Sequence, residues 1–177
     1  MIILVGPSAS GKTEVAKILI KDYGFKKFVT TTTRQMRVNE INDVDYHFIS
    51  LDEFHQKMAN NEFIETVEYN GNFYGTYKSE IDDNKVLIVE PNGLSSFLSL
   101  NNSRIVSFYI DSPKELRKAR MESRQDKKED IIKRLALDDV HFEGVKAKVD
   151  KTIKNLENTK LDDLAKEIIL FYNSIIK

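Results

Sequence analysis

The residues with the clearest chemical use lie in one short run near the start of the chain. Residues Gly6 to Thr13 read G-P-S-A-S-G-K-T and fit the pattern G-x-x-x-x-G-K-S/T of a phosphate-binding loop. Such a loop turns its backbone N–H groups inward around phosphate oxygens, and the positive end of the following helix attracts the anion. We expect Lys12 to reach the β- and γ-phosphates of a bound nucleotide, and the hydroxyl of Thr13 to hold Mg²⁺. The donor-nucleotide contacts predicted from this phosphate loop are Ser8, Ala9, Ser10, Gly11, Lys12 and Thr13.

The segments on both sides of the loop have the patterns that such a loop requires. Ile2 to Val5 is a continuous apolar run, as expected of a parallel strand buried on both faces. Thr13 to Asp22 has apolar residues at helical spacing and is followed by Gly24, a common helix C-cap. This context argues against a chance Gly-Lys turn. The loop fits ATPases, GTPases and kinases equally, so it does not identify the group that accepts the phosphate.

The composition is that of one globular domain of ordinary size. The chain has 177 residues, of which 41% are hydrophobic and 31% charged, the balance of a folded chain. Its net charge of −1 argues against non-specific nucleic-acid binding, which needs a basic surface. No apolar run reaches the ~20 residues of a membrane helix. We therefore expect small-molecule partners, and neither nucleic acid nor a membrane.

Other classes of site are excluded by residue type. Without cysteine there are no disulfides, no thiolate catalysis and no cysteine-bound zinc. The histidines at 47, 55 and 141 lack metal-ligand spacing. Met1 to Val5 leads straight into the phosphate loop without a charged leader, so we expect no signal peptide and a cytoplasmic location.

The middle of the chain has the signals of a small α/β unit with antiparallel strands. Phe28 to Thr31 fits a short strand, and Ser50 with Glu53 forms a capping box that predicts a helix to about Asn60. Asn70-Gly71 is a strong two-residue hairpin signal. It lies between the predicted strands Phe63 to Tyr69 and Asn72 to Thr76.

The rest of the chain returns to alternating strands and helices. Lys85 to Val89 and Ile105 to Ile110 fit central parallel strands, with a helix from about Gly93 to Leu100 between them. Ser112-Pro113 predicts the start of a helix that reaches Ser123, and Arg124 to Asp130 fits a polar loop. Helical spacing resumes at Ile131, and Thr159 can cap a last helix with one apolar face.

Several segments together resemble one known family. Val29 to Arg37, followed by Glu40 and Asp45 to Ser50, resembles the signature of guanylate kinases, which are phosphate-loop nucleoside monophosphate kinases. The resemblance continues through Asn61 to Glu65 and Gly71 to Thr76, in the family's order and near its spacing. It covers most of residues 2–93 and, more loosely, the remainder.

The resemblance implies an α/β fold of the P-loop NTPase type. Three layers around a central parallel sheet would carry a small mixed α/β insertion for the acceptor and a helical lid. The implied division is a core of residues 1–33 and 82–177, with the lid at about 120–135, and a GMP-binding insertion of residues 34–81.

The resemblance also implies which residues grip the acceptor phosphate. Arg34 and Arg37 would bind it, and the hydroxyls of Tyr46 and Tyr74 would add hydrogen bonds. An arginine fork suits phosphate oxygens because it offers paired N–H donors and stays charged at physiological pH. A competing interpretation of Arg37 is that it forms an exposed salt bridge with Glu40 and does not bind phosphate.

Recognition of the base is assigned by the resemblance to Glu65. Guanine presents N1–H and N2–H₂ side by side, and a carboxylate can accept both hydrogens, whereas adenine's bare N1 would leave it unpaired. Thr30 and Thr76 match family hydroxyls near the guanine O6. The competing interpretation of Glu65 is an exposed strand glutamate, as we expect for Glu62 and Glu68.

Three arginines resemble those of the family's lid: Arg120, Arg124 and Arg134. Preorganised guanidinium groups would stabilise the charge on the transferred phosphoryl group once the lid excludes water. Asn155 matches a family asparagine near the donor adenine. We expect the neighbouring charged residues Arg117, Lys118, Lys127 and Lys128 to form only a solvated face.

Four residues depart from the family's pattern. Ala9 stands where the family usually has glycine, which fits only if this residue avoids positive φ. Met36 replaces a proline between the two arginines, which should loosen that turn. Ile88 and Glu90 stand where two acidic residues are usual, so only Glu90 remains as a candidate acceptor or metal contact.

These observations predict an ATP-dependent kinase that phosphorylates GMP or dGMP by in-line transfer, with Mg²⁺ as cofactor and Lys12, Arg34, Arg120, Arg124 and Arg134 as catalytic residues. No general base is needed, because the acceptor phosphate is already an anion. Two alternatives remain: a guanylate-kinase-like binding module with weak catalysis, and a kinase for another nucleoside monophosphate.

Overall fold

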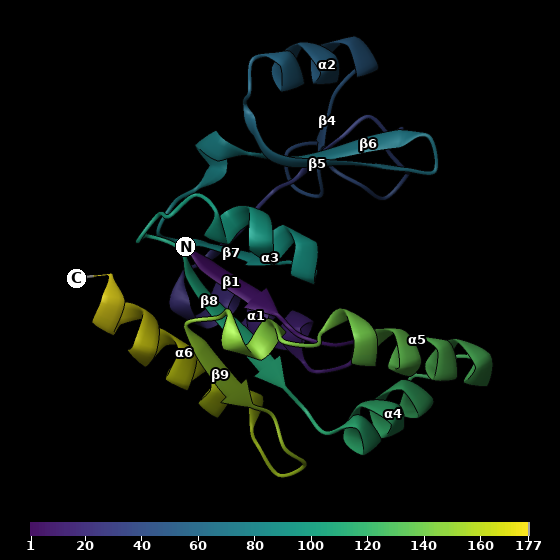
Figure 1. Cartoon of the computed structure of the whole chain (residues 1–177), viewed down its shortest axis with the longest axis vertical. Helices are drawn as coiled ribbons and strands as arrows, with labels where there is room; N and C mark the ends of the chain where they lie inside the picture. The colour runs from purple at the N-terminus through teal and green to yellow at the C-terminus, as the bar shows by residue number, and fades with distance from the viewer. Residues whose placement is uncertain (177) are drawn as a thin grey trace.

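The computed structural model describes residues 1–176 and builds them around a five-stranded parallel sheet (Figure 1). The strands lie in the order β2-β7-β1-β8-β9, so the most apolar strand, β1, is central. Ile2 of β1 is in register with Val86 on one side and Val106 on the other. The strands are β1 (Ile2–Val5), β2 (Lys26–Lys27), β7 (Lys85–Ile88), β8 (Val106–Asp111) and β9 (Lys151–Lys154).

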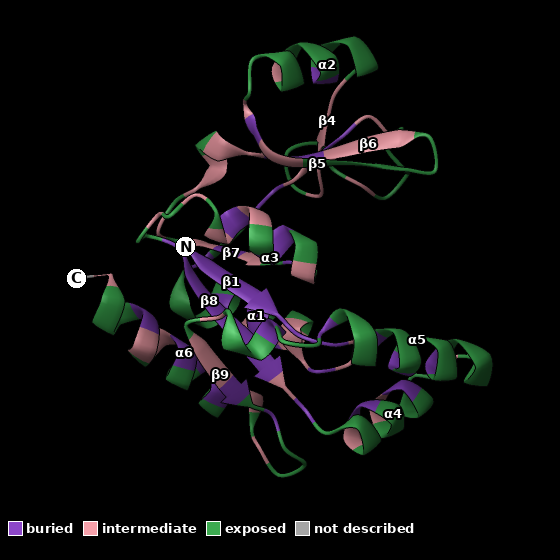
Figure 2. Cartoon of the chain, viewed as in Figure 1, coloured by how far each residue is buried: buried purple, intermediate pink, exposed green. Residues whose placement is uncertain are grey.

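Helices cover both faces of this sheet, because alternate residues of β1 point in opposite directions. Ile2 and Leu4 enter an apolar core formed with α1 and α6, while Ile3 and Val5 enter a second core formed with α3. Figure 2 shows the central strands buried and the outward helix faces exposed. The three-layer α/β fold predicted from the sequence is therefore confirmed. The helices are α1 (Lys12–Tyr23), α3 (Pro91–Leu98) and α6 (Leu161–Ile175).

A second, four-stranded sheet lies beyond α3, in the order β4-β3-β6-β5 (Figure 1). Its hairpin turns at Asn70-Gly71, whose φ angles of 49° and 72° suit the tight turn that the sequence predicts. The Ser50 side chain accepts a hydrogen bond from the Glu53 N–H at 3.1 Å, which confirms the predicted helix cap. The elements are β3 (Thr31–Thr32), β4 (His47–Phe48), α2 (Leu51–Ala59), β5 (Phe63–Tyr69) and β6 (Asn72–Tyr77), followed by a 3₁₀ turn at Lys78–Glu80.

Helix α4 (Lys114–Ser123) follows the carboxyl end of β8, and the next helix, α5 (Lys128–His141), runs beside it (Figure 1). They share a small apolar core of Met121, Ile131 and Leu135. They occupy the region predicted as a lid. A 3₁₀ turn at Val145–Ala147 then leads to β9.

Some local predictions are wrong because tertiary contacts decide the structure there. Phe28 to Thr31 is not one strand, since β2 ends before it in the main sheet and β3 begins at its end in the second sheet. The chain thus changes sheets across this segment. The polar loop after α4 is shorter than predicted, because α5 already begins at Lys128. The helix expected from about Gly93 is present as α3 and begins two residues earlier for a local reason, because Pro91 suits the first helical position.

Two predicted caps also differ. Ser112 does not cap α4; its Oγ accepts a hydrogen bond from Arg120 Nη1 instead. Thr159 precedes Lys160, the N-cap residue of α6, and its Oγ1 accepts from the Leu156 N–H. Both hydroxyls are used by tertiary or turn contacts. Among residues 1–176, no helix combines the length and apolarity needed to cross a lipid bilayer.

Candidate active site

The phosphate loop connects the carboxyl end of β1 to the first residue of α1. Its glycines are required by close packing: a Cβ at Gly6 would lie 2.6 Å from the Ile110 carbonyl oxygen, and one at Gly11 would lie 2.5 Å from Asn155 Nδ2. Lys12 Nζ donates hydrogen bonds to the carbonyls of Gly6 and, at 2.9 Å, of Pro7. Burial lowers the pKa of Lys12, and the nearby carboxylates of Glu90 and Asp138 oppose that shift. The loop therefore places one ammonium group where phosphate would bind.

Ala9 corrects an expectation, because it does not avoid positive φ. Its φ of 59° lies in the left-handed region, which costs a residue with a Cβ about 1 to 2 kcal/mol. The methyl group packs against the small core of Met121, Ile131 and Leu135. This apolar contact is a physical reason for alanine at a position that glycine would occupy without strain.

Arg120 and Arg124 approach the phosphate loop, whereas Arg134 lies apart from it. Arg120 Nη1 donates to the carbonyl oxygens of Ala9, at 3.2 Å, and Ser10, at 3.4 Å. Arg124 lines a small cavity together with loop residues that include Lys12 and Thr13. Arg134 is exposed and pairs with Asp126 at 3.4 Å. The structure thus brings two of the three predicted lid arginines next to the loop.

Asn155, at the end of β9, supports the loop from inside the protein. It is 1% exposed, and its Nδ2 donates to the Ser10 carbonyl at 2.7 Å. Its Oδ1 accepts from Arg120 Nη2 at 3.1 Å. These bonds fix the amide beneath the loop; its contact with a donor adenine remains a prediction.

Arg117 is not part of a solvated face, contrary to expectation. It is 5% exposed and forms an ion pair with Asp138 at 2.8 Å between α4 and α5. Asp138 also accepts hydrogen bonds from the Ser8 N–H, at 3.0 Å, and the Ser8 hydroxyl, at 3.2 Å. Sequence reasoning missed Asp138. A signal was available, since Asp138 follows Ile131 and Leu135 at helical spacing and so falls on the buried face of α5.

A cavity of about 410 Å³ lies between the second sheet and the carboxyl end of β7, and its volume is within the usual range for small-molecule sites. It is named the acceptor cavity after the residues that we expected to contact the acceptor. Six predicted acceptor contacts line it: Thr30, Tyr46, Glu65, Tyr74, Thr76 and Glu90. Three of them lie on β5 and β6 of the second sheet, two directly precede β3 and β4, and Glu90 lies in the loop after β7. The structure therefore brings together residues up to 60 positions apart in sequence, as the resemblance implies.

Glu65 has the surroundings of a recognition group rather than of an exposed strand glutamate. Burial raises the pKa of its carboxyl, and the polar influence of the nearby Ser96 and Thr76 side chains opposes the shift. Gly93 leaves room for the carboxylate, since a Cβ there would lie 3.1 Å from Glu65 Oε1. Glu68, by contrast, is exposed as expected.

The two predicted phosphate arginines lie outside this cavity, on the turn beside it. Arg34 forms an ion pair with Glu40 at 2.7 Å and lies 5.6 Å from the centre of the Tyr46 ring. Arg37 is exposed, and it is its backbone N–H that donates to Glu40, at 2.8 Å. The alternative of an Arg37–Glu40 salt bridge is therefore corrected: Glu40 pairs with Arg34.

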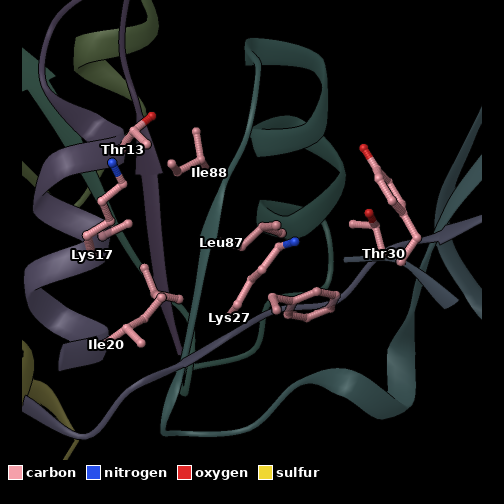
Figure 3. Close-up of a pocket in the computed structure, with 11 residues that line it drawn as sticks. Thr13, Lys17, Ile20, Lys27, Thr30, Leu87 and Ile88 are labelled. Carbon is pink, nitrogen blue, oxygen red and sulfur yellow. The ribbon is translucent and has the colours of Figure 1, made fainter. Parts of the chain in front are cut away.

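A second cavity of about 330 Å³ adjoins the acceptor cavity and reaches α1 (Figure 3). Both cavities are lined by Thr30, Tyr46, Leu87 and Ile88. Of these two cavities, Thr13 lines the second and not the acceptor cavity. Ile88 is 36% exposed at the end of β7. The two cavities thus share a wall between α1 and Glu65, and this wall carries an apolar side chain, Ile88, where the family usually has a carboxylate.

A divalent cation would have few protein ligands here. Within residues 1–176, no group of three His, Cys, Asp or Glu side chains could hold a metal ion. Mg²⁺ commonly binds through one or two protein oxygens together with substrate phosphates and water. Thr13 has an exposed side chain beside Lys12 and Arg124 and fits that mode.

The fold and the site define a class: an α/β protein with a phosphate loop, a separate cavity suited to an acceptor, and arginines of α4 and its C-cap beside the loop. The guanylate kinase family model matches residues 1–169. The chain therefore belongs to the guanylate kinase family.

Relatives and solved structures agree with this assignment. The chain is 30% identical over 162 residues to a guanylate kinase from Fusobacterium nucleatum, covering 88% of this chain and 87% of that protein. It is 49% identical over 77 residues to one from Chlorobaculum tepidum, covering 43% and 40%. The crystal structure of guanylate kinase from Anaplasma phagocytophilum matches all of this chain and 86% of that one, with a TM-score of 0.68 and 25% identity.

For three of the curated relatives, the match spans only 37 to 40% of the relative's length. The strongest local similarity is thus confined to part of the chain.

Proposed function

We propose that this chain transfers a phosphoryl group from ATP to GMP or dGMP. The observation that carries the proposal is the pair of adjoining cavities that lie between Thr13, the last residue of the phosphate-loop pattern, and Glu65, because one enzyme must hold donor and acceptor in line. Family membership supports the same reaction. The net charge of −1 supports small-molecule rather than nucleic-acid partners, and we place the reaction in the cytoplasm.

The donor triphosphate would lie in the phosphate loop. The N–H groups of this loop and the Lys12 ammonium group would bind the β- and γ-phosphates. Thr13 would contribute a hydroxyl ligand to Mg²⁺, which supplies positive charge to the β- and γ-phosphate oxygens when bound. Arg120 and Arg124 would stabilise the charge on the transferred group.

The acceptor would place its guanine at Glu65, which accepts hydrogen bonds from N1–H and N2–H₂, with Thr30 and Thr76 near O6. Tyr46, Tyr74 and Arg37 would bind its phosphate. Arg34 would exchange its Glu40 partner for the same phosphate, one anion for another.

In the transfer, an acceptor phosphate oxygen forms a bond to the γ-phosphorus as the bond from that phosphorus to the β–γ bridging oxygen breaks. ADP leaves, and GMP becomes GDP. The chain's contribution is positioning and charge stabilisation, because the attacking oxygen carries no proton to remove.

The test is ADP formation from Mg-ATP with GMP, dGMP, AMP, CMP, UMP or dTMP as acceptor. We expect turnover with GMP or dGMP only. Lys12→Ala should abolish it, whereas Lys21→Ala, an exposed lysine on the same helix, should not. Glu65→Gln should reduce the preference for guanine, and Glu68→Gln, on the same strand, should not.

The other outcomes point to the alternatives. Turnover with a different acceptor would identify another monophosphate kinase, and Ile88 in the shared wall of the two cavities would then be the first residue to exchange. No turnover with any acceptor, from folded protein that binds ATP, would support a binding module.

A further inference from the structure

The phosphate loop is held from outside by charged side chains of α4 and α5. Asp138 of α5 grips Ser8 through two hydrogen bonds, of 3.0 Å from the N–H and 3.2 Å from the hydroxyl. Arg120 of α4 donates to the carbonyls of the next two residues, Ala9 and Ser10. The left-handed residue, Ala9, is thus fixed on both sides.

Asp138 is buried with its countercharge. Arg117 Nη1 donates to the same Oδ2 atom at 2.8 Å, and both side chains are 10% exposed or less. A buried ion pair stabilises a fold only where its remaining donors are also satisfied. Among the described residues, Arg117 Nε is buried without a hydrogen-bond partner. A contribution to the stability of the fold therefore does not readily explain why this ion pair is present.

The pair lies close to the reaction centre that we propose. Both Asp138 and Arg117 act electrostatically on the Lys12 ammonium group, with opposite signs. The carboxylate therefore reaches the loop with its charge largely balanced, so it can hold the Ser8 N–H without placing a net negative charge beside the donor phosphates. Ala9 itself packs on the apolar core that α4 and α5 share.

From these contacts we infer that Asp138, balanced by Arg117, is a positioning residue that keeps the phosphate loop in the left-handed turn at Ala9. The inference rests on the proposed function only in taking the loop as the ATP site. An alanine favours right-handed or extended backbone when nothing holds it. Without Asp138, a smaller fraction of the molecules would have the loop in the form that binds phosphate. The apparent affinity for ATP would fall in proportion to that fraction.

The test is the dissociation constant of Mg-ATP and of ADP, measured by calorimetry without acceptor, for wild type and Asp138→Asn. The asparagine keeps the shape of the side chain but removes its charge. We expect roughly tenfold weaker nucleotide binding, the usual scale for a lost buried charged hydrogen bond. The KM for GMP should stay within about twofold, because Asp138 is not in the acceptor cavity.

Asp139→Asn is the matched control. Asp139 is the next residue of α5 and also pairs with α4, through Lys114, but at the exposed surface and without contact to the loop. The same substitution there should leave nucleotide affinity unchanged. A second variant, Arg117→Leu with Asp138→Ala, removes both charges. It should fold at least as stably as Asp138→Asn, yet bind ATP as weakly.

Ala9→Gly separates positioning from a general structural role. Glycine adopts positive φ without strain, so the loop should no longer depend on the grip of Asp138. In the Ala9→Gly background, we expect the effect of Asp138→Asn to shrink from about tenfold to about twofold. A simple loss of fold stability would not depend on residue 9.

Three results would overturn the inference: unchanged or tighter nucleotide binding in Asp138→Asn, an equal loss in Asp139→Asn, or an equal loss with glycine at position 9. These are distinct from failure of the proposed function, in which wild type would bind no ATP or would transfer no phosphate to GMP.

Discussion

Glu65 lines the acceptor cavity, where burial raises the pKa of its carboxyl above the usual 4.5. Because this pKa is higher in the folded chain than in the unfolded one, folding favours the protonated form. The stability that the group contributes is fully present below the unfolded pKa and is lost as the pH rises through the folded pKa. At neutral pH, the ionised carboxylate that would recognise guanine therefore destabilises the empty protein.

Glu65→Gln should consequently raise the melting temperature of the nucleotide-free protein at pH 8, and this gain should disappear as the pH falls to about 4. Thermal unfolding at a series of pH values measures it. Glu68→Gln, on the exposed part of the same strand, should show no gain. A melting temperature for Glu65→Gln at or below that of wild type at pH 8 would contradict this account.

Among the elements, α3 turns its N-terminal end toward the same carboxylate. Gly93 is buried in its first turn, and a Cβ there would meet Glu65 Oε1 at 3.1 Å and the Val89 Cβ at 3.2 Å. Glycine costs a helix about 1 kcal/mol relative to alanine in general. Here the missing Cβ leaves the space in which the Glu65 carboxylate lies, so glycine lowers the stability of the helix but makes room for this side chain.

Gly93→Ala should therefore weaken acceptor binding far more than it changes stability. A displaced Glu65 should raise the KM for GMP about ten- to a hundredfold, while the KM for ATP stays constant. Steady-state kinetics with each substrate varied in turn measures both values. Ser95→Ala, at an exposed position of the same helix, is the control and should change neither. Equal increases in both KM values would indicate general distortion instead.

A helix, strand or turn could be predicted from the sequence where residues close together in the chain determine it. The phosphate loop, the Asn70-Gly71 turn and the Ser50 cap are set by neighbouring residues, and all three are present in the structure. β9 escaped notice because it is a short edge strand with a lysine at each end and only Ile153 buried. Its position depends on β8, which no local pattern reveals.

The residues of the candidate site also fall into those that could be predicted from the sequence and those that depend on tertiary contacts. The acceptor residues could be named because the resemblance placed them, and their grouping around one cavity depends on a fold that was itself predictable. Arg117 was misjudged because charge runs usually lie on solvated faces. Its burial depends on one partner 21 residues later, Asp138, which is a tertiary contact.

In the whole molecule, two sheets are joined by few chain crossings, and the acceptor cavity lies between them. Glu65, Tyr74 and Thr76 line it from the second sheet, while Leu87 and Glu90 line it from β7 and the loop that follows. Lys27 of β2 adds a link, donating to the Val44 and Asp45 carbonyls at 3.3 and 3.0 Å. A ligand in the cavity would contact both parts at once and so couple their stabilities.

GMP should therefore stabilise the whole chain as one unit. At 100 times its dissociation constant, a ligand adds about 2.7 kcal/mol to the free energy of unfolding. For a chain of this size, that corresponds to a rise in melting temperature of roughly 5 to 10 °C. Differential scanning calorimetry should show one transition that moves upward with GMP and stays in place with AMP at the same concentration, because AMP offers no hydrogens to Glu65 where guanine offers two. Equal shifts with both nucleotides would mean that binding is governed by phosphate alone, and two separate transitions in the presence of GMP would mean that the ligand does not join the two sheets.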